Sequence, residues 1–199
     1  MKFRNNITGI ILAGGKSSRI GTDKALLKFQ DKTFIQTIYD NIKGLCSEVI
    51  ISSNNPEVKI PGTKIVADKI ENIGPAGGIF SALSASQTEK NMIVSVDTPL
   101  ITIDLIQFLI QHFTDNLDAL IIFENEKLHP LTGMYSKNLI SLFKEEITAG
   151  NYKIRHILSK AATKTADISK ETFYTTRLLS NINTSEDYAK LICDKLKTK

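Results

Sequence analysis

The residues of this chain that could do chemistry begin in the stretch 10–29, IILAGGKSSRIGTDKALLKF. A short apolar run over residues 8–12 predicts a buried strand, which two adjacent glycines, Gly14 and Gly15, bring to an end. Glycines let backbone N–H groups approach an anion closely, and cations that follow them neutralise it. Those cations are Lys16, Arg19 and Lys24. The pattern therefore predicts a loop that holds the phosphates of a nucleotide.

The positive charge of the chain is concentrated at this loop. The net charge is +4, from 25 Lys and Arg against 21 Asp and Glu. Residues 1–32 contain seven basic and two acidic side chains, so this segment has a net charge of +5 and the rest sums to −1. A general nucleic-acid-binding protein would show a broader basic stripe with interleaved aromatic residues. We therefore expect a small phosphorylated ligand and no nucleic-acid partner.

Two familiar phosphate-binding motifs do not fit the glycine loop. A Walker A loop needs a glycine five residues before Gly15, where Ile10 stands, and Gly9 is off by one position. A dinucleotide fingerprint needs G-x-G-x-x-G, whereas the glycines here are adjacent. The remaining pattern is G-G-K-x-x-R-x-G-x-D-K. The alternative to a phosphate-binding loop is an ordinary strand and turn with solvated lysines.

Asp97 follows a second apolar run, residues 91–96, and precedes Thr98 and Pro99. Its carboxylate either caps the following turn or binds a hard cation. Mg²⁺ typically binds one or two carboxylates together with phosphate oxygens. Because a phosphate loop is predicted at the same edge of the sheet, we favour a magnesium ligand at Asp97.

Other polar side chains also follow predicted strands. Asp68 comes after residues 64–67 and is either a turn residue or a ligand contact. Asn54 and Asn55 precede a proline, so a bare turn explains them, but an amide can also read a base edge because it both donates and accepts. Of the three histidines, only His129 is expected near this crevice.

Strand and helix patterns alternate along the chain. The predicted strands cover residues 8–12, 48–52, 64–67, 91–96, 119–123, 131–135 and 173–176. The predicted helices cover residues 33–45, 74–85, 102–113, 136–147, 154–160 and 185–197. We therefore expect one α/β domain over residues 1–199, a Rossmann-like three-layer sandwich whose mostly parallel sheet has helices on both faces. Ligands bind beyond the carboxyl ends of such strands, so the polar residues above should converge on one crevice.

Bulk properties exclude several other classes. No apolar run approaches the roughly 20 residues that a membrane-spanning helix needs. The start of the chain resembles a signal peptide, but its apolar core is too short and is broken by Gly9. Cys46 and Cys193 have no metal-binding or redox spacing and suit a reducing compartment. We expect a cytoplasmic protein with no membrane partner.

The chain resembles the molybdenum cofactor guanylyltransferases, within the wider class of Rossmann-like nucleotidyltransferases. The shared motifs run nearly from end to end: ITGIILAGGKSSRIGTDKALLKF, ISSNN, VAD, GPAGGI, VDTPLI, HPLTGMY and NINTSEDY. The first is shared with sugar-phosphate and isoprenoid-precursor nucleotidyltransferases and indicates only the class. LAGG, HPLTGMY and NINT with its following acidic pair indicate the family.

The resemblance implies transfer of GMP from GTP to the terminal phosphate of molybdopterin, with Mg²⁺ as cofactor and with other cofactor-biosynthesis proteins as possible partners. The nucleotide-binding half would span about residues 1–100 and the acceptor-binding half about residues 101–199. The nucleotide-binding residues that it implies are Leu12, Ala13, Gly14, Gly15, Lys16, Lys24, Asn54, Asp68 and Asp97, with the metal on Asp97. On the acceptor side it implies Lys153, Asn181 and Asn183.

The chain departs from the family pattern at three places. Val96 stands where the family often has cysteine before the metal-binding aspartate, and Ala76 stands in GPA where GPL is common. The basic loop after Gly150 offers only Lys153. None of these departures removes a catalytic group, and the third bears on the choice of acceptor.

The residues alone also fit nucleotidyl transfer. The reaction needs charge stabilisation around the triphosphate and in-line positioning of an acceptor oxygen, and it needs no protein nucleophile. We assign that stabilisation to Lys24, Asp97 and Arg19. A phosphate acceptor is already ionised, so no general base is required. The alternatives are cytidylyl or sugar-1-phosphate nucleotidyl transfer, or an inactive nucleotide-binding regulatory module.

Overall fold

The computed structural model describes residues 5–14 and 22–196 of the 199-residue chain. The strands are β1 (Asn5–Leu12), β2 (Lys28–Phe29), β3 (Lys32–Thr33), β4 (Cys46–Ser52), β5 (Lys64–Val66), β6 (Lys90–Ser95), β7 (Ala119–Glu124), β8 (Lys127–Ser136) and β9 (Thr163–Asp167). The helices are the 3₁₀ turn η1 (Lys24–Leu26), α1 (Phe34–Ile42), α2 (Pro75–Ala85), α3 (Ile103–His112), α4 (Leu139–Thr148), α5 (Ile154–Leu158) and α6 (Ser185–Leu196).

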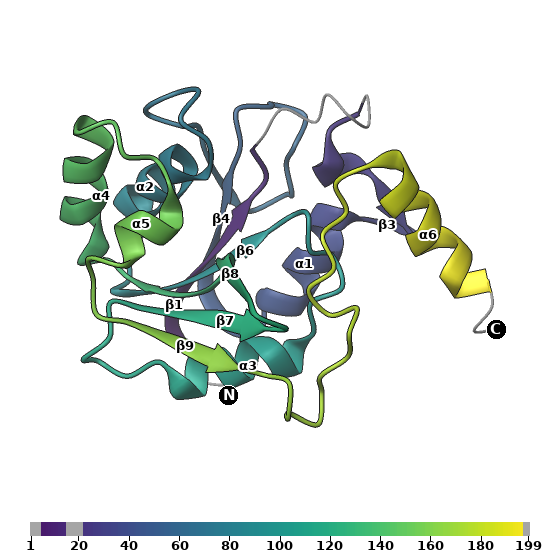
Figure 1. Ribbon diagram of the computed structural model, residues 1–199. Coiled ribbons are helices and arrows are strands. Elements are labelled where there is room, and N and C mark those ends of the chain that lie inside the picture. The colour runs from purple at the N-terminus through teal and green to yellow at the C-terminus, as the bar shows by residue number, and fades with distance from the viewer. Residues whose placement is uncertain (1–4, 15–21, 197–199) are drawn as a thin grey trace.

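The described strands form one large sheet and one small ribbon. The large sheet has the order β5-β4-β1-β6-β8-β7-β9, and β2 pairs only with β3 (Figure 1). Strands β5, β4, β1 and β6 run parallel, as do β7 and β9, while β8 is antiparallel to both of its neighbours. The prediction of a mostly parallel sheet is therefore confirmed.

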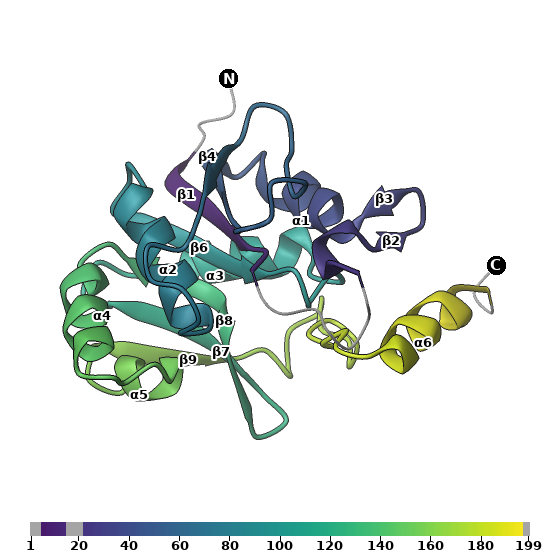
Figure 2. The same ribbon diagram turned by 90° about the horizontal axis from the view of Figure 1, so that it is seen from above.

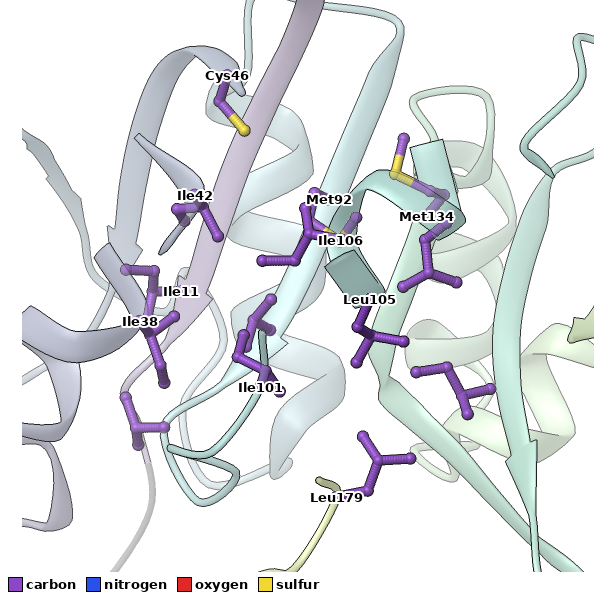
Figure 3. Packing of buried hydrophobic residues seen from close by; sticks show 14 of the residues in the cluster. Ile11, Ile38, Ile42, Cys46, Met92, Ile101, Leu105, Ile106, Met134 and Leu179 are labelled. Carbon is purple, nitrogen blue, oxygen red and sulfur yellow. The ribbon is translucent and has the colours of Figure 1, made fainter. Parts of the chain in front are cut away.

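Helices cover both faces of the large sheet, which confirms the three-layer arrangement (Figure 2). Along β1 the side chains alternate, so that Ile7 and Ile11 face one layer while Ile10 and Leu12 face the other. Helices α1 and α3 pack on the first face, and α2, α4 and α5 pack on the second. Figure 3 shows the first layer, where Ile38 and Leu105 lie over the sheet.

Three of the helices begin at residues suited to that position. The hydroxyl of Thr33 accepts a hydrogen bond from the backbone N–H of Gln36 at 3.3 Å and caps α1. The predicted cap at Thr102 is confirmed, because its hydroxyl accepts from the N–H of Leu105 at 3.4 Å. Helix α2 begins differently, with Gly74 at φ 68° followed by proline at the first helical position.

Helix α6 lies outside the three layers, next to the β2–β3 ribbon, in both views (Figures 1 and 2). Its Leu191 and the preceding Ile182 are buried against Phe34 at the start of α1. Tyr188 contacts the Phe34 ring edge-on at 6.0 Å, and its hydroxyl donates to the Lys28 carbonyl at 2.7 Å. These contacts connect the end of the chain to the segment that follows the glycine loop.

The predicted strand at residues 173–176 is wrong, and β9 takes the edge position instead. Phe173 and Tyr174 have high strand propensity, but they anchor a loop on the core. The Phe173 ring contacts that of Phe108 at 5.7 Å, and the Tyr174 hydroxyl donates to Glu124 at 2.6 Å. The sequence of β9, TKTAD, is mostly polar because only Ala166 faces the core.

In the part of the chain that the structure describes, no helix is long and apolar enough to cross a membrane.

Candidate active site

Four parallel strands end at the same level of the sheet. Leu12 pairs with Ser52 on one side and with Ser95 on the other, and Ser52 pairs with Val66. The loops that follow these strands therefore open at one edge. Strand β8 is antiparallel and pairs Thr132 with Val94, so its first residues lie at this edge too.

A pocket of about 680 Å³ occupies this edge. It is lined by the ends of the four parallel strands, the loops after them, the start of α2 and the start of β8. The lining residues are Leu12, Ala13, Gly14, Asp23, Ser52, Ser53, Asn54, Asn55, Asp68, Asn72, Gly74, Pro75, Gly78, Ser95 and Leu131. The sequence-predicted residues Leu12, Ala13, Gly14, Asn54 and Asp68 are among them.

The glycine loop starts from a fixed position. The backbone N–H of Ala13 donates to the Ser52 carbonyl at 2.8 Å, which continues the pairing of β1 with β4 for one residue. Ala13 is buried and Gly14 is exposed, so the chain reaches the pocket surface at Gly14. The predicted residues Gly15, Lys16 and Arg19 lie outside the described residues.

The start of α2 forms the opposite wall, and the sequence analysis did not include it among the site residues. Gly74 and Gly78 both line the pocket. A Cβ on Gly78 would lie 2.9 Å from Ser52 Oγ and 3.4 Å from Asp68 Oδ1, so a larger residue would displace this wall. Ala76, which stands where the family commonly has leucine, is fully buried in the core. This difference from the family therefore affects core packing.

We expect Gly78→Ala to destabilise the protein by a net ~1 kcal/mol. The methyl group would lie 2.9 Å from Ser52 Oγ, and this overpacking, which costs about 1–3 kcal/mol, opposes the ~1 kcal/mol that alanine gains over glycine inside a helix. It should also reduce the stabilisation by bound nucleotide, since Ser52 and Asp68 line the pocket. Thermal unfolding with and without nucleotide measures both effects. Gly44→Ala is the control, because a Cβ there meets nothing within 4 Å. Equal behaviour of the two variants would contradict the close contact.

Asn54 and Asp68 lie together across the loops after β4 and β5. Asn54 Oδ1 accepts a hydrogen bond from the backbone N–H of Asp68 at 2.8 Å. Burial raises the pKa of Asp68 above its ordinary value, the Glu71 carboxylate acts in the same direction, and a hydrogen bond with Ser52 opposes them. Because Asn54 Oδ1 accepts from the Asp68 N–H, the Asn54 amide holds the loop after β4 against the residue that follows β5.

A side-chain hydrogen bond connects the loop after β4 with the segment that contains Lys24. Asn55 Nδ2 donates to Asp23 Oδ2 at 2.8 Å, and Asp23 Oδ1 accepts from the N–H of Ala25 at 3.0 Å. Asp23 thus caps η1, whose first residue is Lys24. The sequence pattern pointed to Lys24 and, as an alternative to a bare turn, to Asn55 as a group that reads a base, but not to the bond between Asn55 and Asp23.

Lys24 lies at the centre of a group of residues that are distant in the sequence. Its Nζ donates to Asn183 Oδ1 at 2.5 Å. The neighbouring N–H of Ile182 donates to the backbone carbonyl of Asp97 at 2.8 Å, and the Asp97 side chain is half-buried. The structure therefore joins Lys24 to Asn183 and holds the chain next to Asn183 on the Asp97 backbone. None of these three predicted residues lines the pocket, although Asp23 and Ser95 close to them in the sequence do. Asn181, two residues before Asn183, is exposed.

The sequence is similar along most of its length to proteins of one family. The MobA-like NTP transferase domain matches residues 9–166. A Flavobacterium johnsoniae protein named "Probable molybdenum cofactor guanylyltransferase" is 35% identical over 182 residues, which are 91% of this chain and 94% of that protein. A protein of the same name from Aquifex aeolicus VF5 is 31% identical over 93% of this chain and 90% of its own length.

This chain belongs to the MobA-like NTP transferase family. A crystal structure of molybdopterin-guanine dinucleotide biosynthesis protein A from Archaeoglobus fulgidus has the same fold. The TM-score is 0.80 at 20% identity, over 96% of this chain and 99% of that one.

The residues that the resemblance assigns to the acceptor lie on two different sides of this MobA-like chain. Lys153 precedes α5 and is exposed, and α5 packs with α2 and α4. Asn183 precedes α6, on the side of the β2–β3 ribbon (Figure 2). Arg155 NH2 donates to the Leu128 carbonyl at 3.0 Å, which ties α5 to the start of β8.

His129 lies on β8, two residues before the pocket residue Leu131. Its side chain is 15% exposed, and its Nε2 is 3.3 Å from Glu124 Oε2. Among the described residues this Nε2 has no hydrogen-bond partner, so the contact with Glu124 is an ion-pair distance without hydrogen-bond geometry. Burial lowers the pKa of His129 more than the Glu124 carboxylate raises it, which favours a neutral imidazole at pH 7.

The donor set at the site fits Mg²⁺ of the kind that is shared with substrate. In the described parts of the chain no three His, Cys, Asp or Glu side chains form a group that could hold a metal alone. Mg²⁺ is usually bound by one or two carboxylates plus phosphate oxygens and water. Asp97 follows the pocket residue Ser95 by two positions, and the carboxyl-bearing residues Asp23 and Asp68 line the pocket itself, so the one or two carboxylates of such a site are available here.

Proposed function

We propose that this protein transfers GMP from GTP to the terminal phosphate of molybdopterin and releases pyrophosphate. The observation that supports the proposal is the hydrogen bond of Lys24 with Asn183, whose neighbour Ile182 bonds to the Asp97 backbone, next to a pocket that Asp23 and Ser95 line at the carboxyl edge of the sheet. Ligands of open α/β sheets bind at this edge. The names of the relatives supply the substrates, GTP and molybdopterin.

In this proposal the base lies in the pocket between the glycine loop and the start of α2. Backbone groups of Leu12 to Gly14 and the side chains of Asn54 and Asp68 line that space. Because Asn54 Oδ1 already accepts from Asp68 N–H, we assign the Nδ2 donor of Asn54 to the ligand. The triphosphate would then extend toward Lys24 and Asp97.

The chemistry requires charge stabilisation and positioning. Lys24 would stabilise the charge that develops on the transferring phosphate, because its ammonium is held by Asn183 and it follows the pocket residue Asp23 in the chain. We assign Mg²⁺ to Asp97, and the ion would neutralise the charge of the triphosphate when bound. The acceptor phosphate is ionised at neutral pH, so the neutral His129 is not needed as a base.

The direct test of the proposal is conversion of GTP and molybdopterin into the guanine dinucleotide form with stoichiometric pyrophosphate. Release of pyrophosphate only when molybdopterin is present supports the proposal. Transfer from CTP in place of GTP, or to a sugar phosphate in place of molybdopterin, would contradict it.

We expect GTP with Mg²⁺ to stabilise the protein more than CTP, ATP or UTP. Guanine offers N1–H and an exocyclic amine as donors and O6 as an acceptor, and adenine presents the opposite pattern at those positions. Each buried group left unpaired costs about 1–3 kcal/mol, so two of them give discrimination of roughly 10²-fold or more. A ligand that binds only the native state raises its stability by mass action.

Thermal unfolding with each of the four nucleotides measures this preference. A larger shift with CTP would place the protein among cytidylyltransferases and leave the phosphate-site assignments unchanged. Equal shifts with all four nucleotides would mean that only the triphosphate is read, and the assignment of Asn54 to the base would then be wrong.

A further inference from the structure

The turn before α6 is held by a reciprocal set of hydrogen bonds. Asp187 Oδ2 accepts from the backbone N–H of Asn183 at 3.0 Å and from that of Thr184 at 2.9 Å. In return, Thr184 Oγ1 accepts from the N–H of Asp187 at 3.1 Å. This is a capping box, in which the first turn of the helix fixes the backbone that enters it.

The same turn is anchored on its other side. The N–H of Ile182 donates to the Asp97 carbonyl at 2.8 Å, and the Ile182 side chain is buried with Phe34 and Leu191. Asn183 therefore lies between two fixed points, the Asp97 backbone and the Asp187 carboxylate. Its side-chain Oδ1 accepts a hydrogen bond from Lys24 Nζ at 2.5 Å.

We propose that Asp187 is a positioning residue, which orients Lys24 by fixing the backbone of Asn183. The proposal rests on the proposed function, because it makes Asp187 act on the group that would stabilise the transferring phosphate. An ammonium has three donors, so a bond to Asn183 is compatible with a simultaneous contact to a phosphate oxygen. In this arrangement Asn183 acts on the phosphate side of the site rather than only on the pterin.

The charge of Asp187 is suited to this role. The two backbone N–H groups and the Thr184 hydroxyl lower the pKa of Asp187, so it is a carboxylate at neutral pH. Its neighbour Glu186 lies in the same first turn of α6 and is exposed. Both residues interact with the same helix dipole, which makes Glu186→Ala the matched control for loss of charge.

The first experiment needs no turnover. Lys24 labelling by reductive methylation is followed in the substrate-free protein by peptide mass spectrometry. We expect Asp187→Ala and Asn183→Ala to accelerate labelling about fivefold, the factor that one net hydrogen bond of about 1 kcal/mol gives. Glu186→Ala should leave the rate unchanged. Because Asp187 would act on Lys24 only through the bond that Asn183→Ala removes, the double variant should label no faster than Asn183→Ala alone.

The second experiment measures steady-state guanylyl transfer. Asp187→Ala should lower kcat with little change in the KM for GTP, and the loss should disappear in the Asn183→Ala background. A purely structural role would instead lower the unfolding temperature and add to the effect of Asn183→Ala. If Asp187→Ala does not fold at the assay temperature, Thr184→Ala keeps the Asp187 carboxylate but removes the hydroxyl that holds it and accepts from the N–H of Asp187, and it should also accelerate labelling.

The outcomes separate the two proposals. Absence of guanylyl transfer in the wild-type protein overturns the proposed function, while the labelling result still decides whether Asp187 acts on Lys24. Unchanged labelling of Lys24 in folded Asp187→Ala, or additive effects in the double variant, overturns the positioning role.

Discussion

Asp97→Ala is expected to abolish nucleotidyl transfer and to leave the fold intact. The carboxylate would bind the metal, and loss of several kcal/mol of charge stabilisation lowers kcat by about 10³-fold or more. The fold should persist because Ile182 is anchored by the backbone carbonyl of Asp97, which alanine retains. Turnover at saturating Mg²⁺, together with thermal unfolding, measures both parts of the prediction.

Two further variants make the Asp97 result specific. Asp97→Asn keeps the size of the side chain but removes its charge, so it should be as inactive as Asp97→Ala. Asp104→Ala removes a charge from the exposed first turn of α3 and should retain normal turnover. Near wild-type turnover of Asp97→Ala at saturating Mg²⁺ would exclude the metal role and leave the turn cap as the function of this side chain.

Most of the central sheet could be predicted from the sequence. Strands β1, β4 and β6 are buried on both faces, so they appear as short apolar runs between turn residues. The edge strand β9 pairs on one side only, with β7, and its sequence is mostly polar. The sequence of β9 therefore has no alternating apolar pattern that would predict a strand. Residues 173–176 form a loop, but their aromatic and threonine residues have high strand propensity and so predict a strand.

The individual site residues could be named from the sequence, but their arrangement could be predicted only where strand ends determine it. Asp68 and Asp97 follow strands, and the parallel order brings these ends to one edge. The contact between Lys24 and Asn183 joins residues 159 positions apart, and it depends on where α6 packs. No local pattern determines that packing, because α6 lies against Phe34 and not on the sheet.

Side-chain partners were likewise beyond the sequence pattern. The motif that contains Asp23 and Lys24 indicated a phosphate-binding lysine, but the bond from Asn55 to Asp23 appears only when β4 and η1 are placed side by side. The same holds for His129 and Tyr174, which come from two different segments and both contact the Glu124 carboxylate.

Lys24→Ala is expected to lose about 2–4 kcal/mol of transition-state stabilisation, by analogy with removal of one oxyanion-hole donor. The effect should appear in kcat and in kcat/KM to the same extent, since the ammonium would interact most strongly with charge that develops during transfer. Lys28→Ala is the control, because it removes an exposed lysine from the same positively charged segment. It should leave kcat unchanged.

The split between kcat and KM decides what Lys24 does. A rise in the KM for GTP with constant kcat would make Lys24 a group that binds substrate and transition state equally. An equal loss of kcat in Lys24→Ala and Lys28→Ala would mean that the protein uses only the net positive charge of this segment. Added salt would then screen the effect of that charge on kcat. A loss confined to Lys24 and insensitive to salt requires the short, fixed contact that Asn183 maintains at 2.5 Å. In that case Asn183→Ala should have a smaller effect than Lys24→Ala, because it leaves the charge in place and removes only its orientation.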